Sequence, residues 1–300
     1  MVFIKSEGKF NENTYLFDGR VMNIPNFLSV YIIENNGLRL MVDTPQEQFV
    51  RRFLKKIKEF GIYPIHKIIL THSHFDHISG TGKLKKLIKE TEIEVLASEN
   101  AIENLNYPEK MNDIFNLSVN PVYDVKPLKE GDFINLNGLE LEVLNFFGHT
   151  MDSIGILDKK NENLFLGDAI LDKFDPETFN PPFMPPDFHE SELLKSFQKL
   201  RKIKDELHSI SLAHFGIWKD DDMVKIIDEM EDLYFKTKNS IIKWYKEEHS
   251  TEHITLKYHD KYIKNSTIHT KDNMLILQFL VEMLIEGLKT SGIIPLELYT

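Results

Sequence analysis

The stretch His72-Ser73-His74-Phe75-Asp76-His77 places four ionisable side chains within six residues. It closely follows the apolar stretch Ile65–Leu70, which is typical of a buried strand. Burying so many ionisable groups costs too much free energy unless something compensates them. A divalent cation is the obvious compensator, so the stretch predicts a metal site at the end of a strand.

The residue types of this stretch suit particular cations. Neutral imidazole binds zinc, iron, nickel and copper, and a carboxylate can bridge two ions and offset their charge. Alternate residues of an extended segment point to the same side, so His72 and His74 can approach one ion together. Asp76 and His77 lie past the bend and can face a second ion.

Three later residues occur in the same kind of place. His149, Asp168 and His214 each follow, or nearly follow, an apolar strand-like stretch. Functional groups cluster where rigid strands end, because the sheet fixes the root of the loop. We therefore expect these three residues to join residues 72–77 in one site.

The first two thirds of the chain alternates apolar stretches with charged helical patterns, which predicts an α/β protein. The predicted strands are Ser29–Glu34, Leu38–Val42, Ile65–Leu70, Ile93–Ala97, Leu139–Phe147, Ile154–Leu157, Leu164–Leu166 and Ile210–Ala213. The predicted helices are Gln46–Phe60, Gly82–Glu90 and Glu190–Glu206. The proline-rich segment Phe174–Pro186 can be neither a helix nor a central strand. It is either a stiff surface connection or a rigid wall beside a pocket.

The composition excludes several kinds of site. The chain has 300 residues, 12 histidines and no cysteine, which excludes disulfides, thiolate nucleophiles and zinc sites that need sulfur. The net charge of −11 argues against a protein held mainly by charge to nucleic acid or an anionic membrane. The start of the chain turns polar before a signal-peptide core could form, and no apolar run approaches the ~20 residues that cross a bilayer. We expect a cytoplasmic protein with no membrane partner.

The pattern changes after about Trp218. Residues 220–245 have an acidic start followed by apolar residues at helical spacing, and Asp272–Lys289 is a second amphipathic helical pattern. A mixed polar stretch lies between them. We predict a catalytic domain over residues 1–218 and a small, mostly helical extension over residues 219–300.

The motif at residues 72–77 resembles the signature of the metallo-β-lactamase superfamily. The remaining motifs of that superfamily have similar stretches here, in the same order: Val42-Asp43-Thr44-Pro45, Gly148-His149-Thr150, Gly167-Asp168-Ala169 and Ala213-His214-Phe215-Gly216. The resemblance covers roughly residues 20–218. It implies a four-layer αββα sandwich with the metals at one edge of the paired sheets.

The resemblance also implies roles for individual residues. It assigns His72, His74 and His149 to a first metal. It assigns Asp76, His77 and His214 to a second metal, with Asp168 bridging both. It gives Asp43 the place of a buried residue that orients the metal loop.

The sequence departs from the motifs of some branches of the superfamily, which narrows the set of branches that it can resemble. The last motif is usually Gly-His-Gly, whereas Ala213 and Phe215 add bulk around His214. The missing cysteine excludes the β-lactamase subclasses that use a sulfur ligand. His74 stands where the diiron flavoprotein branch usually has Glu. The interval from Asp168 to His214 is too short for the inserted domain of the cleavage-factor nucleases.

The leading prediction is a dinuclear metal-dependent hydrolase in which a metal-bridging hydroxide attacks a small ester, thioester or lactone. The cofactors would be two divalent metal ions, with Zn2+ expected and Fe or Mn as alternatives. Asp76 or Asp168 would handle the proton as a catalytic group as well as bind metal. The expected partner is therefore a small-molecule substrate.

Two alternatives stay open. The C-terminal region resembles the extension of lactamase-like endoribonucleases in size and helical character, although glyoxalase II also carries a helical C-terminal domain. A metal-dependent endoribonuclease or phosphodiesterase would use this region to bind nucleic acid. The locally basic stretch of Lys257, Lys261, Lys264 and Lys271, interleaved with Tyr258 and Tyr262, would then contact phosphates rather than solvent alone. The other alternative is a mononuclear iron dioxygenase that acts on a persulfide.

Other residues receive simpler interpretations. Trp244 and Tyr245 are expected in a helix core, with a homodimer face or a substrate platform as the alternatives. His189 closes the proline-rich segment between two predicted ligands, so it is a candidate for lining the pocket. The remaining histidines are expected to be structural or solvated (His66, His208) or exposed (His249, His253, His259, His269).

Overall fold

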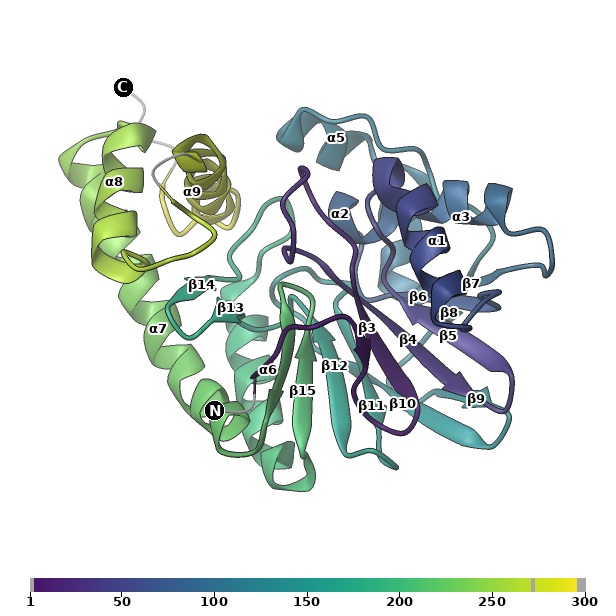
Figure 1. Cartoon of the computed structure of the whole chain (residues 1–300). Helices are drawn as coiled ribbons and strands as arrows, with labels where there is room; N and C mark the ends of the chain where they lie inside the picture. Colours follow the sequence, from purple (N-terminus) through teal and green to yellow (C-terminus); the bar gives the residue numbers. More distant parts are fainter. Residues whose placement is uncertain (1–2, 271–272, 296–300) are drawn as a thin grey trace.

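The computed structural model describes residues 3–270 and 273–295. Within these residues, two seven-stranded sheets pack face to face and helices cover both outer faces (Figure 1). The first sheet has the order β2 (Gly8–Lys9), β3 (Thr14–Asp18), β4 (Ser29–Asn35), β5 (Leu38–Val42), β6 (Lys67–Leu70), β7 (Glu94–Ser98) and β8 (Val125–Leu128). The second sheet has the order β1 (Phe3–Ile4), β16 (Gly216–Lys219), β15 (Ser209–Leu212), β12 (Asn163–Gly167), β11 (Ile154–Asp158), β10 (Leu139–Asn145) and β9 (Phe133–Leu136).

The helices are divided between the two outer layers and the C-terminal region. Over the first sheet lie the 3-10 helix Glu47–Phe49, α1 (Val50–Glu59), α2 (Phe75–Ile78), α3 (Thr81–Leu87), the 3-10 helix Glu99–Ala101, α4 (Ile102–Asn106) and α5 (Glu109–Phe115). On the second sheet's side lie α6 (Glu190–Ile203), the 3-10 helix Lys204–Glu206, α7 (Asp220–Glu247), α8 (Thr251–Tyr262) and α9 (Met274–Thr290). A small hairpin of β13 (Asp172–Asp175) and β14 (Thr178–Asn180) lies between the second sheet and these C-terminal helices.

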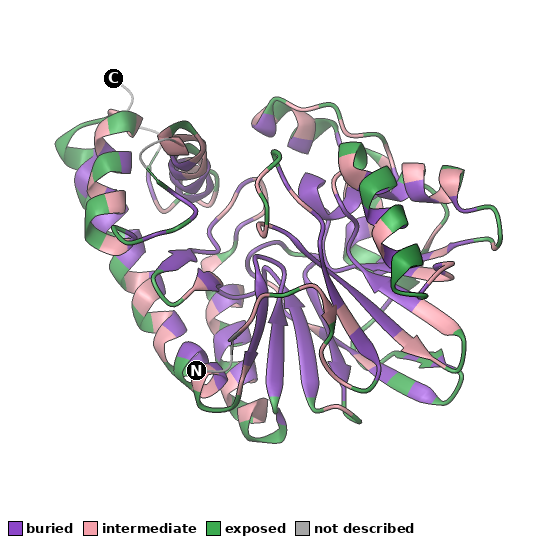
Figure 2. Cartoon of the chain, viewed as in Figure 1, coloured by how far each residue is buried: buried purple, intermediate pink, exposed green. Residues whose placement is uncertain are grey.

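Alternation of side chains along the strands produces the layers. In β4, Tyr31 and Ile33 face the core between the sheets, whereas Val30 and Ile32 face the core under α1. A third core joins the other face of the second sheet to α6 and continues through α7 to α9. Figure 2 shows that the strands are largely buried while the outer sides of the helices are exposed. Three cores separate four layers, which confirms the predicted αββα sandwich with a helical C-terminal region.

The sequence located most of the elements that build the sheets. The predicted strands at Ser29–Glu34, Leu38–Val42 and Ile154–Leu157 match β4, β5 and β11 closely. The sequence did not predict a helix in the mixed polar stretch between the two C-terminal helices, where Thr251–Tyr262 is helical. Only Ile254, Thr255 and Tyr258 of α8 are buried, so its sequence carries a weak amphipathic signal. The division of the chain at residue 218 stays a prediction.

No helix within residues 3–270 and 273–295 combines the length and apolar character that a membrane span requires.

A close backbone contact joins α9 to the proline-rich segment. Gly287 lies in α9, and a Cβ atom on it would stand 2.3 Å from the Phe183 carbonyl oxygen. That distance is far below van der Waals contact with an atom that the backbone holds in place. The contact therefore requires glycine at position 287.

We expect Gly287→Ala to lower the free energy of unfolding by about 1–3 kcal/mol, because the helix must move away from the segment. Gly82→Ala in α3 is the matched control, since a Cβ there meets nothing within 4 Å. The control should stabilise the protein by up to about 1 kcal/mol through helix propensity. Urea unfolding followed by circular dichroism measures both changes. Equal stability of the two variants would contradict the close contact.

Candidate metal centre

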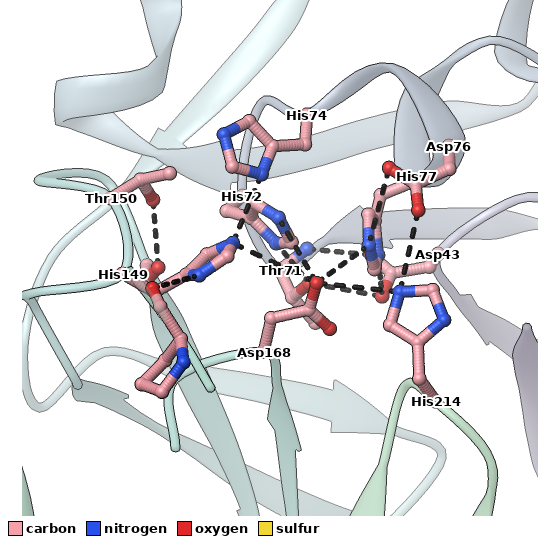
Figure 3. A network of polar contacts seen from close by, with 12 residues as sticks. Asp43, Thr71, His72, His74, Asp76, His77, His149, Thr150, Asp168 and His214 are labelled. Carbon is pink, nitrogen blue, oxygen red and sulfur yellow. Dashed lines mark hydrogen bonds and ion pairs between the residues drawn. The ribbon is translucent and has the colours of Figure 1, made fainter. Parts of the chain in front are cut away.

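The 72–77 motif lies where β6 ends at the edge of the first sheet. Thr71 to His74 continue beyond the strand, and Phe75 starts the short helix α2, so the motif bends at His74. His72, His74, Asp76 and His77 are all buried. The predicted residues His149, Asp168 and His214 come from loops of the second sheet and meet the motif here (Figure 3).

Asp168 is at the centre of this cluster. Its Oδ2 atom lies close to the Nε2 atoms of four histidines: 3.3 Å from His77, 3.4 Å from His214, 3.7 Å from His149 and 3.8 Å from His72. Asp76 lies on one side of this centre, with its Oδ2 atom 3.3 Å from His214 Nε2. His74 lies on the other side, with its Nδ1 atom 3.0 Å from His149 Nε2. The structure thus brings together all seven residues that the sequence selected.

Each of the five histidines uses its other ring nitrogen outside the cluster. The outer contacts are His214 Nδ1 to the Phe27 carbonyl at 2.7 Å, His149 Nδ1 to the Pro182 carbonyl at 2.8 Å, His77 Nδ1 to Asp43 Oδ2 at 2.9 Å, His74 Nε2 to the Pro185 carbonyl at 3.1 Å and His72 Nδ1 to Thr71 Oγ1 at 3.1 Å. Carbonyl and carboxylate oxygens only accept, so the histidines facing them must donate from the outer nitrogen. The Thr71 hydroxyl donates to Asp43 Oδ2 and accepts from His72. In the neutral rings this leaves a lone pair on every inner nitrogen.

The inner atoms fit a cation. His74 Nδ1 and His149 Nε2 face each other with lone pairs, and no proton is available to join them. His72 Nε2, His77 Nε2 and Asp168 Oδ1 are buried without a hydrogen-bond partner. Buried polar atoms without partners are costly, and a metal ion supplies the missing positive charge. Nitrogen and carboxylate donors of this kind are typical of zinc and iron sites.

Burial and charge divide the histidines into two sets. Burial, with the neighbouring His74, lowers the pKa of His149 to about 4. Burial likewise lowers the pKa of His72 and of His74, so these three rings are neutral at neutral pH. Burial also opposes charge on His77 and His214, but the nearby carboxylates, Asp168 first, outweigh it and hold the pKa of both rings well above the usual value. A cation at the second set must therefore displace protons.

Asp43 supports the motif from behind. Its Oδ1 atom accepts the Thr71 backbone N–H at 2.8 Å, and its Oδ2 atom accepts from the Thr71 hydroxyl and from His77. Asp43 itself has φ of +60°, an uncommon conformation that its buried hydrogen bonds stabilise. One carboxylate thus sets the positions of Thr71 and His77 together.

The last motif, Ala213-His214-Phe215-Gly216, is bulkier than the usual Gly-His-Gly, yet His214 lies in the cluster. Phe215 turns into the core between the two sheets, where it is fully buried. The Ala213 carbonyl accepts the Ser29 backbone N–H at 2.7 Å, which fixes the turn to β4. The side chain of Phe215 is therefore part of the core, and His214 keeps its place.

A pocket of about 720 Å³, including space open to solvent, leads to the cluster. Asn180, Pro181 and Met184 of the proline-rich segment line it, so this segment is a pocket wall and not a mere surface connection. The prediction for His189 is wrong: this residue is exposed at the start of α6, outside the lining. The prediction of an exposed His269 is also wrong. Its ring is buried and lines the pocket, because the loop before α9 folds back over β14.

The sequence did not select Asp172, Asn180 or His269, although all three line the pocket. Asp172 follows Asp168 by four residues, and this spacing was the only signal within the sequence. Asn180 stands opposite Asp172 in the β13–β14 pairing. Burial and the neighbouring Asp168 raise the pKa of Asp172 well above the usual value.

Residues 24–214 match the model of the metallo-beta-lactamase superfamily. This match covers more than half of the chain, and the fold and the histidine–aspartate cluster agree with it, so the chain belongs to this superfamily.

More distant comparisons agree with the family. A probable metallo-hydrolase of Streptococcus pyogenes serotype M6 is 26% identical over 147 residues, which are 47% of this chain and 61% of that protein. A hydroxyacylglutathione hydrolase of Aliivibrio salmonicida is 26% identical over 206 residues, which are 69% of this chain and 63% of that protein. The chain therefore spans about three fifths of the length of these curated relatives. The crystal structure of a metallo-beta-lactamase family protein from Thermus thermophilus has the same fold, with a TM-score of 0.65, 18% identity and 92% of each chain covered.

Replacing Asp43 tests the support behind the motif. In Asp43→Asn one carboxylate oxygen becomes an NH2 group, which faces donors that need an acceptor. We expect the affinity for Zn2+ to fall by about 10–100-fold, as for other groups that hold a metal ligand in place. Competition with a chromogenic chelator measures the affinity.

Asp158→Asn is the control for the loss of a buried carboxylate, because Asp158 lies at the far end of β11 and accepts hydrogen bonds from Asn161 there. This control should keep the wild-type affinity. An Asp43→Asn protein that binds Zn2+ as tightly as the control would contradict the supporting role.

Proposed function

We propose that this chain is a dinuclear metal-dependent hydrolase of a small ester, thioester or lactone. The observation that carries the proposal is the convergence of four inner histidine nitrogens on the carboxylate of Asp168, with the inner nitrogen of His74 beside that of His149. A relative named hydroxyacylglutathione hydrolase supports acyl hydrolysis as the type of reaction. Zn2+ is the expected metal, with Fe or Mn as alternatives.

Two groups of donors support two cations. His72, His74 and His149 offer atoms that lie within 4.8 Å of one another, and so do Asp76, His77 and His214. These two groups share no residue, and a further group of His72, His77 and Asp168 takes one histidine from each of them. We propose that the first group holds one cation, that the second group holds the other, and that Asp168 bridges them.

Two such cations, when bound, would supply Lewis acidity and lower the pKa of a water molecule towards neutrality. The chain supplies the proton acceptors. Asp168 Oδ1 is buried and has no hydrogen-bond partner, so it is free to accept a proton from the attacking water. Asp76 Oδ2 lies 3.3 Å from His214 Nε2 and is the second candidate for this role.

The nuclease alternative receives less support. Tyr258 of the basic stretch is buried, Lys257 pairs with Glu247 at 2.9 Å, and Lys261 donates to Ser240. Lys264 is exposed, and Lys271 lies outside the described residues. The described lysines of this stretch do not line the metal pocket. A persulfide dioxygenase would use one iron, and a single cation leaves the second donor group without a role.

The variant His74→Ala tests the metal assignment. We expect wild-type protein to bind two equivalents of Zn2+, and the variant to retain fewer, because one donor of the first group is gone. The value of kcat/KM for p-nitrophenyl acetate should fall by more than about 100-fold. This is a larger loss than the removal of a residue that only supports a metal ligand can cause. Mass spectrometry of metals and an absorbance assay measure the two effects.

His189→Ala is the matched control, because this histidine is exposed and lies outside the pocket. It should keep both the metal and the rate. A His74→Ala protein with full metal content and the wild-type rate would overturn the assignment.

A further inference from the structure

Helix α9 has two apolar faces. Leu277, Val281, Leu284 and Leu288 are buried in the core shared with α7 and α8. Ile276, Phe279, Leu280 and Met283, at helical spacing, line the metal pocket instead. A helix that packs on a protein core needs only one apolar face. The second apolar face of α9, which lines the pocket, therefore requires another explanation.

The opposite wall of the pocket is apolar as well. Phe115 at the end of α5 stands across from α9, with its ring centroid 6.4 Å from that of Phe279. Met22 and Phe27, from the loop between β3 and β4, complete this side. Figure 1 shows α9 facing α5 above the edge of the sheets where the metal cluster lies. Among the described residues that line the pocket there is no lysine or arginine.

A few polar atoms interrupt these apolar walls. Asp172 Oδ1, Asn180 Oδ1 and both ring nitrogens of His269 are buried and have no hydrogen-bond partner. The three residues are 7%, 4% and 0% exposed. Burial lowers the pKa of His269 to about 4, so the ring is neutral and offers one N–H donor and one acceptor. Buried polar atoms in a pocket require a ligand or water to bond to.

The position of His269 is fixed by the hairpin below it. Ser266 Oγ accepts the backbone N–H of His269 at 2.9 Å and also lies 2.9 Å from Thr178 Oγ1 in β14. Asn180 ends the same strand. His269 and Asn180 are therefore held on one rigid unit beside the cluster, which is what recognition of a polar substituent needs.

We propose that this pocket binds an uncharged ester, thioester or lactone whose apolar acyl chain lies along α9 and whose hydroxyl or amide substituent bonds to His269 and Asn180. This inference rests on the proposed function and adds the class of substrate. In the reaction, water oxygen bonds to the acyl carbon and the bond from that carbon to oxygen or sulfur breaks. One water proton goes to the leaving alcohol or thiol, and the other is released as the product acid ionises.

The same walls disfavour anionic substrates. A glutathione thioester carries carboxylates remote from the reacting carbonyl, and they would enter a pocket without a described lysine or arginine. A phosphodiester chain would meet the same difficulty beyond its reacting phosphate. We therefore expect S-lactoylglutathione and bis(p-nitrophenyl) phosphate to be poor substrates.

The first test compares acyl chain lengths with the metal-loaded full chain. We expect kcat/KM for p-nitrophenyl octanoate to exceed that for the acetate by at least about tenfold, because each buried CH2 contributes up to about 0.8 kcal/mol. Ile276→Asn should reduce this ratio several-fold. Leu275→Asn is the matched control, since Leu275 is the adjacent residue of α9, is 80% exposed and lies outside the pocket.

The second test concerns the polar substituent. Wild-type protein should prefer p-nitrophenyl 3-hydroxyoctanoate to the octanoate by about tenfold, which corresponds to one satisfied buried hydrogen-bonding group. His269→Phe keeps the bulk of the ring and should abolish this preference. Metal content and the midpoint of urea unfolding are measured for every variant, so that a loss of fold or metal is recognised separately.

The outcomes separate the two proposals. Hydrolysis of p-nitrophenyl acetate without any preference for longer chains would overturn this inference and leave the proposed function standing. Faster hydrolysis of S-lactoylglutathione than of p-nitrophenyl octanoate would do the same. A metal-loaded protein that hydrolyses none of the acyl substrates would overturn both.

Discussion

The site depends on one constraint: each of five buried imidazole rings is held through its outer nitrogen, so that its inner nitrogen is directed at the centre of the cluster. Without these outer partners the rings could turn, and without positive charge between them the lone pairs of the neutral rings His74 and His149 would repel each other. The chain supplies the acceptors from distant segments, including the carbonyl of Phe27 before β4 and the carbonyl of Pro182 in the wall. The sandwich brings these segments to one edge of the sheets, so the fold and the protonation of the rings serve the same centre.

The helical C-terminal region takes part in this centre as well as in the core. Its helix α9 belongs to the core shared with α7 and α8 through one face and to the pocket through another. A region predicted as a possible arm for nucleic acid is therefore part of the wall around the reacting groups. Its described lysines lie away from this wall, and its apolar side chains lie on it.

The sequence predicted the seven clustered residues because they stand in a fixed order after strands, and the strand pattern follows from side-chain alternation. It could not predict the carbonyls of Pro182 and Pro185 as partners of His149 and His74, because a backbone acceptor has no residue type of its own. His269 was missed for a related reason. Its burial depends on how the loop folds over β14, a tertiary contact through Ser266 that no local pattern encodes.

The placement of Phe183 has a wider consequence. Its neighbours in the segment hold two of the clustered histidines through their carbonyls, and its own carbonyl lies against the backbone of α9. The binding of a cation by these histidines and the docking of α9 on the segment would thus be thermodynamically linked. Whatever free energy a cation gains from well-placed rings also stabilises the attachment of the last helix, and a well-seated helix tightens the hold on the cation to the same extent. A cation bound at this site and helix α9 docked on the segment would therefore each stabilise the other.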